Sequence, residues 1–210
     1  MYSLYYAPGA ASLVVHWLLI ELGVAHEIKR LDLSSREHKS AEYLALNPSG
    51  LVPTLIVDGA PVTECAALVL LLAERHPEAE FEPERGSRER ALYLQWTLYL
   101  ANTLQPAFRL WWYPAEAAGE AHIEAAQALA EQRVGAVFER LDAHLAAHGP
   151  YICGDAISAV DFLATMLMRW SRNMPKPATA WPALAEYATR MKARPSFKTL
   201  YEREGLTEWA

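Results

Sequence analysis

A carboxylate and a thiol stand side by side where a helix is expected to begin. Thr63 and Glu64 follow a short strand-like run, and Cys65 opens an apolar run typical of a buried helix. The first N–H groups of a helix lack internal partners, and the helix dipole adds to their attraction for anions. Glu64 would in turn attract a cation. We therefore predict a site for a zwitterion, with its carboxylate on the amides of Cys65 and Ala66 and its ammonium group on Glu64. Ordinary helix capping by Glu64 is the alternative.

Val52 and Pro53 add a second feature just before the strand-like run. A bond that precedes proline is the usual place for a cis peptide. A cis bond here would turn the N–H and C=O of Val52 outward, where an extended peptide could pair with them. A zwitterionic end and a peptide-like middle together describe γ-glutamyl-cysteinyl-glycine, which is glutathione. Ordinary loop chemistry is the alternative interpretation of this pair.

A β-hairpin is predicted to carry these residues. Asp58 and Gly59 lie between two β-rich runs, residues 54–57 and 61–63. Asp-Gly between two such runs is a strong hairpin signal. The apolar helix that starts near Cys65 follows the hairpin directly, so the turn, the strands and the helix start form one local unit.

A strand, a helix and a second strand are expected before the hairpin. Their expected ranges are 2–6, 12–22 and 25–31, and Gly23 ends the helix. A crossover helix between the two strands implies that they run parallel, whereas the hairpin is antiparallel. The sequence therefore predicts an α+β, thioredoxin-like N-terminal domain with a mixed four-stranded sheet.

The second half of the chain is predicted to be an all-α C-terminal domain. Residues 78–86 are acidic, contain proline and lack periodicity, so we interpret them as a linker between domains at 1–77 and 87–210. Long helices are expected over 87–111 and 115–148. A later helix carries Ser158 at its N-cap with Asp161 three residues on, which is the pattern of a capping box.

Two stretches of the chain resemble the glutathione S-transferase family. The run Asn-Pro-x-Gly-x-Val-Pro-x-Leu at residues 47–55, followed by Thr-Glu-Cys-Ala-Ala at 63–67, resembles its glutathione-binding half. Cys65 departs from the serine that usually stands there. The run Leu-Tyr-Tyr-Ala-Pro-Gly-Ala-Ala-Ser at 4–12 is similar to the bacterial, beta-like members. The resemblance covers essentially the whole chain and implies a homodimer with glutathione as co-substrate.

The resemblance implies that Val52, Pro53, Glu64 and Cys65 bind glutathione. It also directs attention to His38 and Lys39, which lie in the polar loop before Asn47. Family members often recruit a residue of this loop to the glycine carboxylate of glutathione. Solvated loop charges are the alternative for both. Cys65 is interpreted as a small residue in place of serine, although a thiol at a helix N-terminus could also be redox-active.

The group that stabilises the thiolate is the least obvious part of the site. A free thiol with a pKa of about 8.5 is mostly protonated at neutral pH, and a hydrogen bond to sulfur favours the thiolate. Beta-like relatives place a cysteine where Ala11 stands, and serine-using classes place a serine where Ala10 stands. Ser12 is our first candidate donor and Tyr6 the second. A plain N-cap and a core aromatic are their alternatives, and we interpret His16, one turn after Ser12, as a buried histidine.

Aromatic residues near the end of the first long helix are candidates for a second pocket. Phe108 and Trp112 could wall a hydrophobic site for the electrophile. Aromatic residues at helix ends more often pack in the core, which is the alternative for both.

Composition limits the remaining possibilities. The chain has 210 residues and a net charge of -6, which argues against a nucleic-acid or anionic-membrane surface. Its two cysteines and the absence of a signal peptide lead us to expect a cytoplasmic protein. Its seven scattered histidines argue against a metal site.

These observations lead to one principal hypothesis and two alternatives. The principal hypothesis is a glutathione transferase that activates the glutathione thiolate for attack on small hydrophobic electrophiles. A glutathione-dependent disulfide or peroxide reductase is the second possibility. The third is a transferase-like binding or regulatory module without chemistry, which Ala10 and Ala11 would suit.

Overall fold

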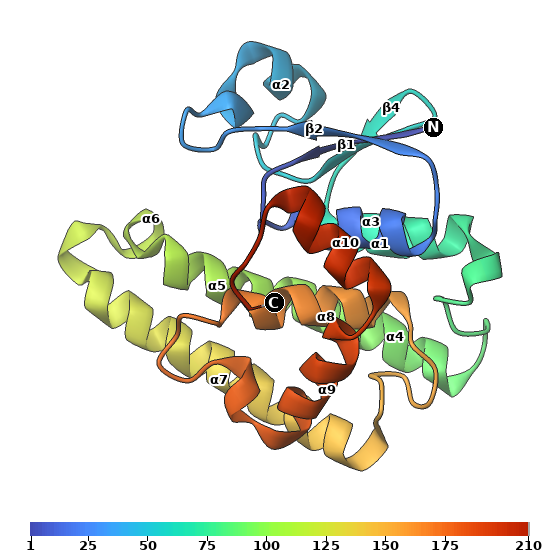
Figure 1. Cartoon of the computed structure of the whole chain (residues 1–210). Helices are drawn as coiled ribbons and strands as arrows, with labels where there is room; N and C mark the ends of the chain where they lie inside the picture. Colours follow the sequence, from blue (N-terminus) through green and yellow to red (C-terminus); the bar gives the residue numbers. More distant parts are fainter. Residues whose placement is uncertain (210) are drawn as a thin grey trace. The chain divides into compact units, whose positions relative to one another are not determined.

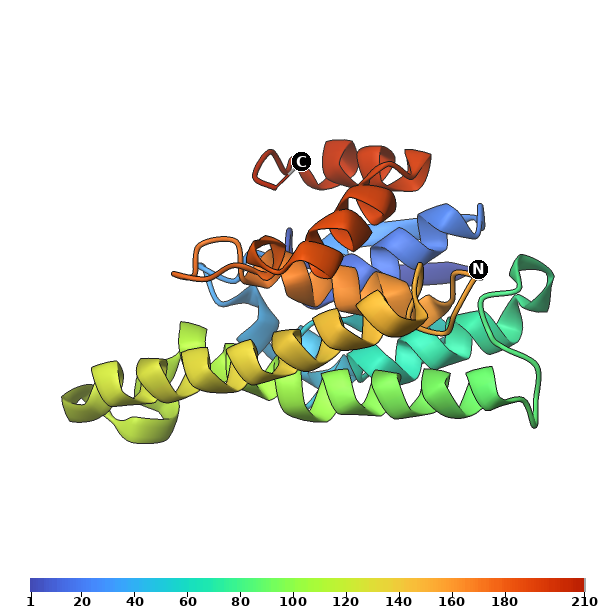
Figure 2. The same ribbon diagram turned by 90° about the horizontal axis from the view of Figure 1, so that it is seen from below.

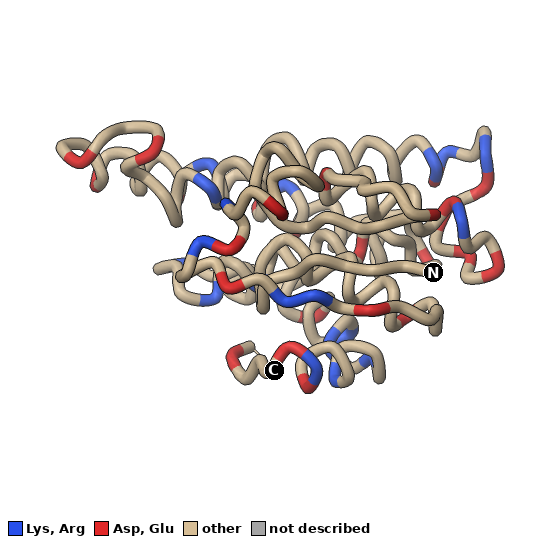
Figure 3. Tube along the Cα trace, turned by 90° about the horizontal axis from the view of Figure 1, so that it is seen from above, with Lys and Arg blue, Asp and Glu red and all other residues tan. Residues whose placement is uncertain are grey.

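The computed structural model describes residues 1–209, which form two compact units. The first unit contains Met1–Glu82 together with the chain from Lys192 onward, and the second is Pro83–Met191. Acidic and basic residues are interspersed along the trace, without a long run of either sign (Figure 3). Within residues 1–209, no helix is long and apolar enough to cross a membrane.

The first unit is built on a mixed four-stranded sheet. Its strands are β1 (Tyr2–Tyr6), β2 (His26–Arg30), β3 (Thr54–Val57) and β4 (Ala60–Val62), in the order β2-β1-β3-β4. β1 pairs parallel with β2 and antiparallel with β3, and β3 pairs antiparallel with β4. This topology confirms the prediction of a thioredoxin-like sheet with one parallel pair and one hairpin.

Helices cover both faces of this sheet. α1 (Ser12–Glu21) and α3 (Cys65–Arg75) lie on one face, and the short α2 (Ala41–Leu46) lies on the other (Figure 1). Alternate residues of β1 are buried, as expected for a strand with one face against helices. α1 is apolar on nearly all sides and almost completely buried, which is typical of a helix surrounded by other elements. Short 3₁₀ turns lie at Glu37–Lys39 and Pro77–Ala79.

The last helix, α10 (Pro195–Glu204), groups with the sheet and not with the other C-terminal helices. Its contacts with α1 explain this grouping. The indole Nε1 of Trp17 donates to the Ser196 hydroxyl at 2.8 Å, and the ring of Phe197 lies edge-on to Trp17 at 5.2 Å. The expected helical domain at 87–210 therefore differs from the observed grouping at its C-terminal end.

The named elements of the second unit are all helices or helical turns. Its helices are α4 (Arg88–Tyr99), α5 (Gln105–Trp112), α6 (Pro114–Ala118), α7 (Ile123–His148), α8 (Ala159–Trp170) and α9 (Pro182–Lys192). A π-helical segment, η3 (Leu100–Leu104), joins α4 to α5, and 3₁₀ turns lie at Glu120–His122 and Ala178–Ala180. α5 packs along α7 (Figure 2).

The two predicted long helices differ from the structure in different ways. The first stays helical from Arg88 to Trp112, with a π-helical turn just before Pro106, whose nitrogen cannot donate to a preceding turn. Gly119, with φ of 72°, ends α6 and separates it from α7. The sequence therefore placed the helical regions correctly but missed the π-helical turn and the break at Gly119.

Candidate functional site

The predicted location of the zwitterion site is the start of α3. Glu64 is exposed, and its backbone has φ of 71° and ψ of 111°, a rare conformation for a residue other than glycine. Its side chain makes no capping hydrogen bond to the helix. Among the described residues, no acceptor lies opposite the N–H groups of Cys65 and Ala66. The structure therefore leaves both a free carboxylate and two free amides at this helix start, and ordinary capping by Glu64 does not occur.

The loop before β3 presents a free backbone edge at Val52. The peptide bond from Val52 to Pro53 is cis. Internal hydrogen bonds hold the loop, since the Asn47 amide nitrogen donates to the Leu51 carbonyl at 2.7 Å and the Tyr43 hydroxyl donates to the same oxygen at 2.6 Å. Within residues 1–209, the N–H and C=O of Val52 make no hydrogen bond. They are thus available to a peptide-like ligand.

His38 and Lys39 lie beside residues 49 and 50 of this loop. The Lys39 ammonium group donates to the carbonyls of Ser49 and Gly50, at 3.1 and 2.8 Å. Gly50 has φ of 58°, and a Cβ there would lie 2.8 Å from the His38 carbonyl and the Lys39 nitrogen. Only glycine fits this close approach. The Lys39 ammonium group is thereby held against the backbone of the loop.

Cys65 is a structural thiol in this arrangement. It is buried, and its Sγ donates to the Ala11 carbonyl at 3.4 Å. Burial, assisted by the charge of Glu64, raises the pKa of the Cys65 thiol to about 12. A thiol that stays protonated is a poor nucleophile. The placement agrees with a small residue in place of serine and not with a redox-active cysteine.

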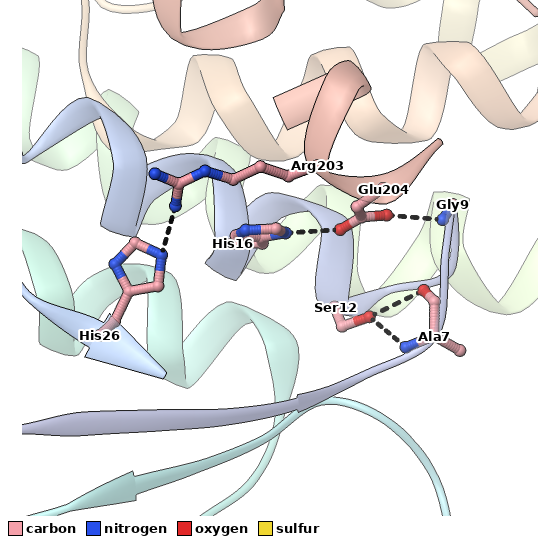
Figure 4. A network of polar contacts seen from close by, with 7 residues as sticks. All are labelled: Ala7, Gly9, Ser12, His16, His26, Arg203 and Glu204. Carbon is pink, nitrogen blue, oxygen red and sulfur yellow. Dashed lines mark hydrogen bonds and ion pairs between the residues drawn. The ribbon is translucent and has the colours of Figure 1, made fainter. Parts of the chain in front are cut away.

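Ser12, the first candidate for the sulfur donor, faces its own loop. Its side chain is completely buried, and its Oγ accepts from the Ala7 N–H at 3.1 Å and donates to the Ala7 carbonyl at 3.2 Å (Figure 4). A hydroxyl has one hydrogen to donate, and here that hydrogen is used. The N-cap of α1 is Ala11, so Ser12 is not the N-cap either. This geometry speaks against Ser12 as the donor to a sulfur.

Tyr6, the second candidate, lies at the end of β1 with its ring against His16, at a centroid distance of 5.6 Å. Burial and then the negative charge of Glu204 raise the pKa of Tyr6, whereas Arg30 acts in the opposite direction. A raised pKa keeps the phenol protonated at neutral pH, so its hydroxyl remains a possible donor.

Backbone N–H groups are the remaining donors in this loop. Ala10 and Ala11 offer no polar side chain. In the part of the chain that the structure describes, the N–H groups of Ala11 and Ser12 have no acceptor. Both lie at the start of α1, where free amides and the helix dipole favour an anion.

A buried polar network that sequence reasoning missed holds the same loop. Glu204, the last residue of α10, has one oxygen 2.8 Å from His16 Nδ1 and the other 2.8 Å from the Gly9 N–H (Figure 4). His16 and Glu204 are both fully buried at their side chains. Nearby, Arg203 lies 3.2 Å from His26 Nε2. His16 was expected to be buried, but nothing local in the sequence marks Glu204 as its partner.

The two aromatic candidates for an electrophile pocket belong to the second unit and differ from each other. Phe108 is completely buried, and its ring packs against Phe138 at 6.2 Å and Trp170 at 5.8 Å between centroids. The prediction that Phe108 walls an open pocket is therefore corrected, because its ring fills the core. Trp112 is 43% exposed and Tyr113 49%. Trp112 thus remains accessible to a ligand.

Among the residues that the structure describes, no group of three or more His, Cys, Asp or Glu side chains is placed to hold a metal ion.

Comparisons with known proteins agree with this geometry. Residues 10–75 match the family model of the glutathione S-transferase N-terminal domain, and residues 101–204 match that of the C-terminal domain. A curated relative, glutathione S-transferase GST-4.5 of Xanthomonas campestris pv. campestris, is 29% identical over 97% of this chain and 99% of its own.

Solved structures agree as well. A sphingomonad glutathione S-transferase complexed with glutathione is 31% identical, with a TM-score of 0.85 over 98% of this chain and 100% of that chain. A glutathione transferase homologue from Sulfitobacter with bound glutathione is 25% identical, with a TM-score of 0.91 over 99% of both chains. With the mixed sheet, the free edge of Val52 and the open start of α3, these matches show that the chain belongs to the glutathione S-transferase family.

Proposed function

We propose that this protein binds glutathione in its first unit and activates the thiol for attack on a small hydrophobic electrophile. One observation carries the proposal. The start of α3 leaves the Glu64 carboxylate and the amides of Cys65 and Ala66 without partners among residues 1–209. A zwitterionic amino-acid end satisfies all of these groups at once, because its ammonium pairs with the carboxylate and its carboxylate accepts from the amides.

The rest of glutathione follows from the same surface. The free N–H and C=O of Val52 pair with the cysteinyl backbone, in the manner of a strand added to an exposed edge. Lys39 and His38 lie on the loop that packs against residues 49 and 50, where they support binding of the glycine carboxylate. The ammonium group at one end of the tripeptide then pairs with the Glu64 carboxylate, and the carboxylate at the other end lies near the Lys39 ammonium group.

The chemistry requires a thiolate held in place. The thiol loses its proton to water, the sulfur forms a bond to the electrophilic carbon, and the leaving group departs with the electron pair of the broken bond. Hydrogen bonds to the sulfur lower its pKa, and each unit is worth about 1.4 kcal/mol. The donors that remain are the Tyr6 hydroxyl and the backbone amides of Ala11 and Ser12.

The reductase alternative has less support than conjugation. Reduction through a mixed disulfide with the protein relies on a reactive protein cysteine. Both cysteines of this chain are buried, and burial raises the pKa of Cys65 to about 12 and that of Cys153 to about 11. Neither is suited to form a mixed disulfide.

We further propose that the protein is a homodimer and that it is located in the cytoplasm. We also propose that Trp112 contacts the electrophile. Leu94 and Leu98, one turn apart on α4, are 37% and 52% exposed. A subunit interface over α4 would cover them. Two free cysteines fit a reducing compartment. Sedimentation tests the dimer, since a species of 23.5 kDa alone would contradict it.

Retention on immobilised glutathione tests the principal proposal. The wild type should be retained and released by free glutathione, and Glu64→Gln should pass through the column because the carboxamide carries no charge for the ammonium group. Glu84→Gln is the matched control, since Glu84 is also exposed and loses the same charge. Failure of the wild type to bind at millimolar glutathione would refute the proposal.

A further inference from the structure

The loop between β1 and α1 is held by side chains from three different helices. Ser12 of α1 holds both backbone groups of Ala7, and Cys65 of α3 donates to the Ala11 carbonyl. Glu204 of α10 accepts from the Gly9 N–H. These contacts fix residues 7–11 at three separate points, although the loop carries no polar side chain of its own.

Glu204 makes the most specific of these contacts. Its two oxygens serve different partners, the Gly9 N–H and His16 Nδ1, both at 2.8 Å. It is completely buried at its side chain. Burying a carboxylate costs desolvation free energy, which its hydrogen bonds must offset. An apolar side chain at the end of α10 could have packed on α1 without that cost. The carboxylate differs from such a side chain in that it holds the loop at Gly9.

This loop is the part of the chain that must face the sulfur if glutathione binds as proposed. Alanines occupy positions 10 and 11, and the Ser12 hydroxyl is used within the loop. The N–H groups of Ala11 and Ser12 remain without an acceptor in the described chain. A backbone donor cannot rotate as a side chain does, so its aim depends on how the loop is held.

We propose that Glu204 is a positioning residue: by holding the Gly9 N–H, with His16 fixing its second oxygen, it aims the free amides of Ala11 and Ser12 at the sulfur of bound glutathione. The inference rests on the proposed glutathione site and adds a residue from the far end of the sequence to it. Donors stabilise a developing anion only when they lie about 2.7–3.1 Å from it. A loop released at Gly9 would lose that fit while the ammonium and carboxylate contacts of glutathione stay intact.

Three variants separate positioning from stability. Glu204→Ala removes both hydrogen bonds of the carboxylate. Ser196→Ala is the matched control, because Ser196 lies on the same helix and bonds Trp17 of the same α1 without touching the loop. Glu204→Gln is the rescue, since its oxygen can accept from Gly9 while its amide donates to His16 Nδ1. The histidine can then carry its proton on Nε2, which is buried without a partner among residues 1–209.

The readout is the pKa of the thiol of bound glutathione, followed by thiolate absorbance against pH, with glutathione affinity and melting temperature measured alongside. We expect Glu204→Ala to raise this pKa by about one unit, a tenfold decrease in the acid dissociation constant of the thiol, with less than about a threefold change in affinity. Ser196→Ala should lower the melting temperature and leave the pKa at its wild-type value. Glu204→Gln should restore the wild-type pKa.

Several results would overturn the inference. One is an unchanged thiol pKa in Glu204→Ala, which would make Glu204 a purely structural residue. An equal rise in Ser196→Ala, or no recovery in Glu204→Gln, would also refute positioning through Gly9. If Glu204→Ala does not fold, the thiol pKa is measured on Glu204→Asp, whose side chain is one methylene shorter. The same rise in pKa is expected, and an unchanged pKa would refute the inference. Wild-type protein that binds no glutathione would instead refute the proposed function, and the inference with it.

Discussion

Two helix starts in this protein use the same physical features in opposite ways. At the start of α8, Asp161 accepts from the backbone N–H groups of Ser158 and Ile152 at 2.7 and 2.9 Å. The hydroxyls of Ser158 and Tyr187 donate to the same carboxylate at 3.0 and 2.8 Å. The side chain of Asp161 is fully buried, and the predicted capping box is present.

At the start of α3, the corresponding groups stay open. Glu64 is exposed and does not cap the helix, and its backbone adopts a rare positive φ. Such strain costs about 1–3 kcal/mol and clusters at functional sites. A helix start that serves stability satisfies its own donors, whereas one that serves binding leaves them for the ligand. Burial and the hydrogen-bond partners of the carboxylate therefore distinguish the two roles.

The largest effect should come from the closed helix start. Asp161→Ala leaves two buried N–H groups without their acceptor and takes one of their acceptors from the hydroxyls of Ser158 and Tyr187. Each unsatisfied buried group costs about 1–3 kcal/mol, so we expect a loss of at least about 3 kcal/mol in the free energy of unfolding. Urea denaturation measures it, and a loss below about 1 kcal/mol would contradict the account. Glutathione affinity of the folded protein should not change.

The open helix start should respond in the opposite sense. Glu64→Gly removes the carboxylate and relieves the positive φ, which glycine adopts freely. We expect glutathione affinity to fall by about 30- to 100-fold, or about 2–3 kcal/mol, while the free energy of unfolding rises by about 1 kcal/mol. Calorimetric titration and urea denaturation give the two values. A loss of stability with unchanged affinity would break the comparison.

The smallest effect concerns the thiol beside the open amides. The pKa of Cys65 is raised to about 12 by burial, so above pH 9 the unfolded chain loses this proton before the folded one does. Stability from this group is complete below the unfolded pKa and falls by about 1.4 kcal/mol per pH unit as the pH rises toward 12. Cys65→Ser should therefore be relatively more stable at pH 10 than at pH 8, by about 1.4 kcal/mol in urea denaturation under reducing conditions. An equal difference at both values would contradict the burial of the thiol.

Local patterns in the sequence were enough to predict much of the fold and part of the site. Asp58 and Gly59 indicated the hairpin, and Ser158 with Asp161 indicated the capping box, because each signal acts within a few residues. Glu64 was placed at the start of α3 for the same reason. The family resemblance rested on similar short runs, which the fold brings to the end of the sheet where β1 and β4 end and β3 begins.

Only the tertiary structure decided which way side chains point and which distant residues meet. The sequence could not show that the Ser12 hydroxyl turns back to Ala7 or that the Phe108 ring fills the core, since both depend on the packing around them. Glu204 and His16 are separated by 188 residues. Their contact follows from the packing of α10 on α1, and no local propensity encodes it. The groups proposed to bind glutathione were thus located from local sequence, whereas the control of the loop that should face the sulfur depends on long-range contacts.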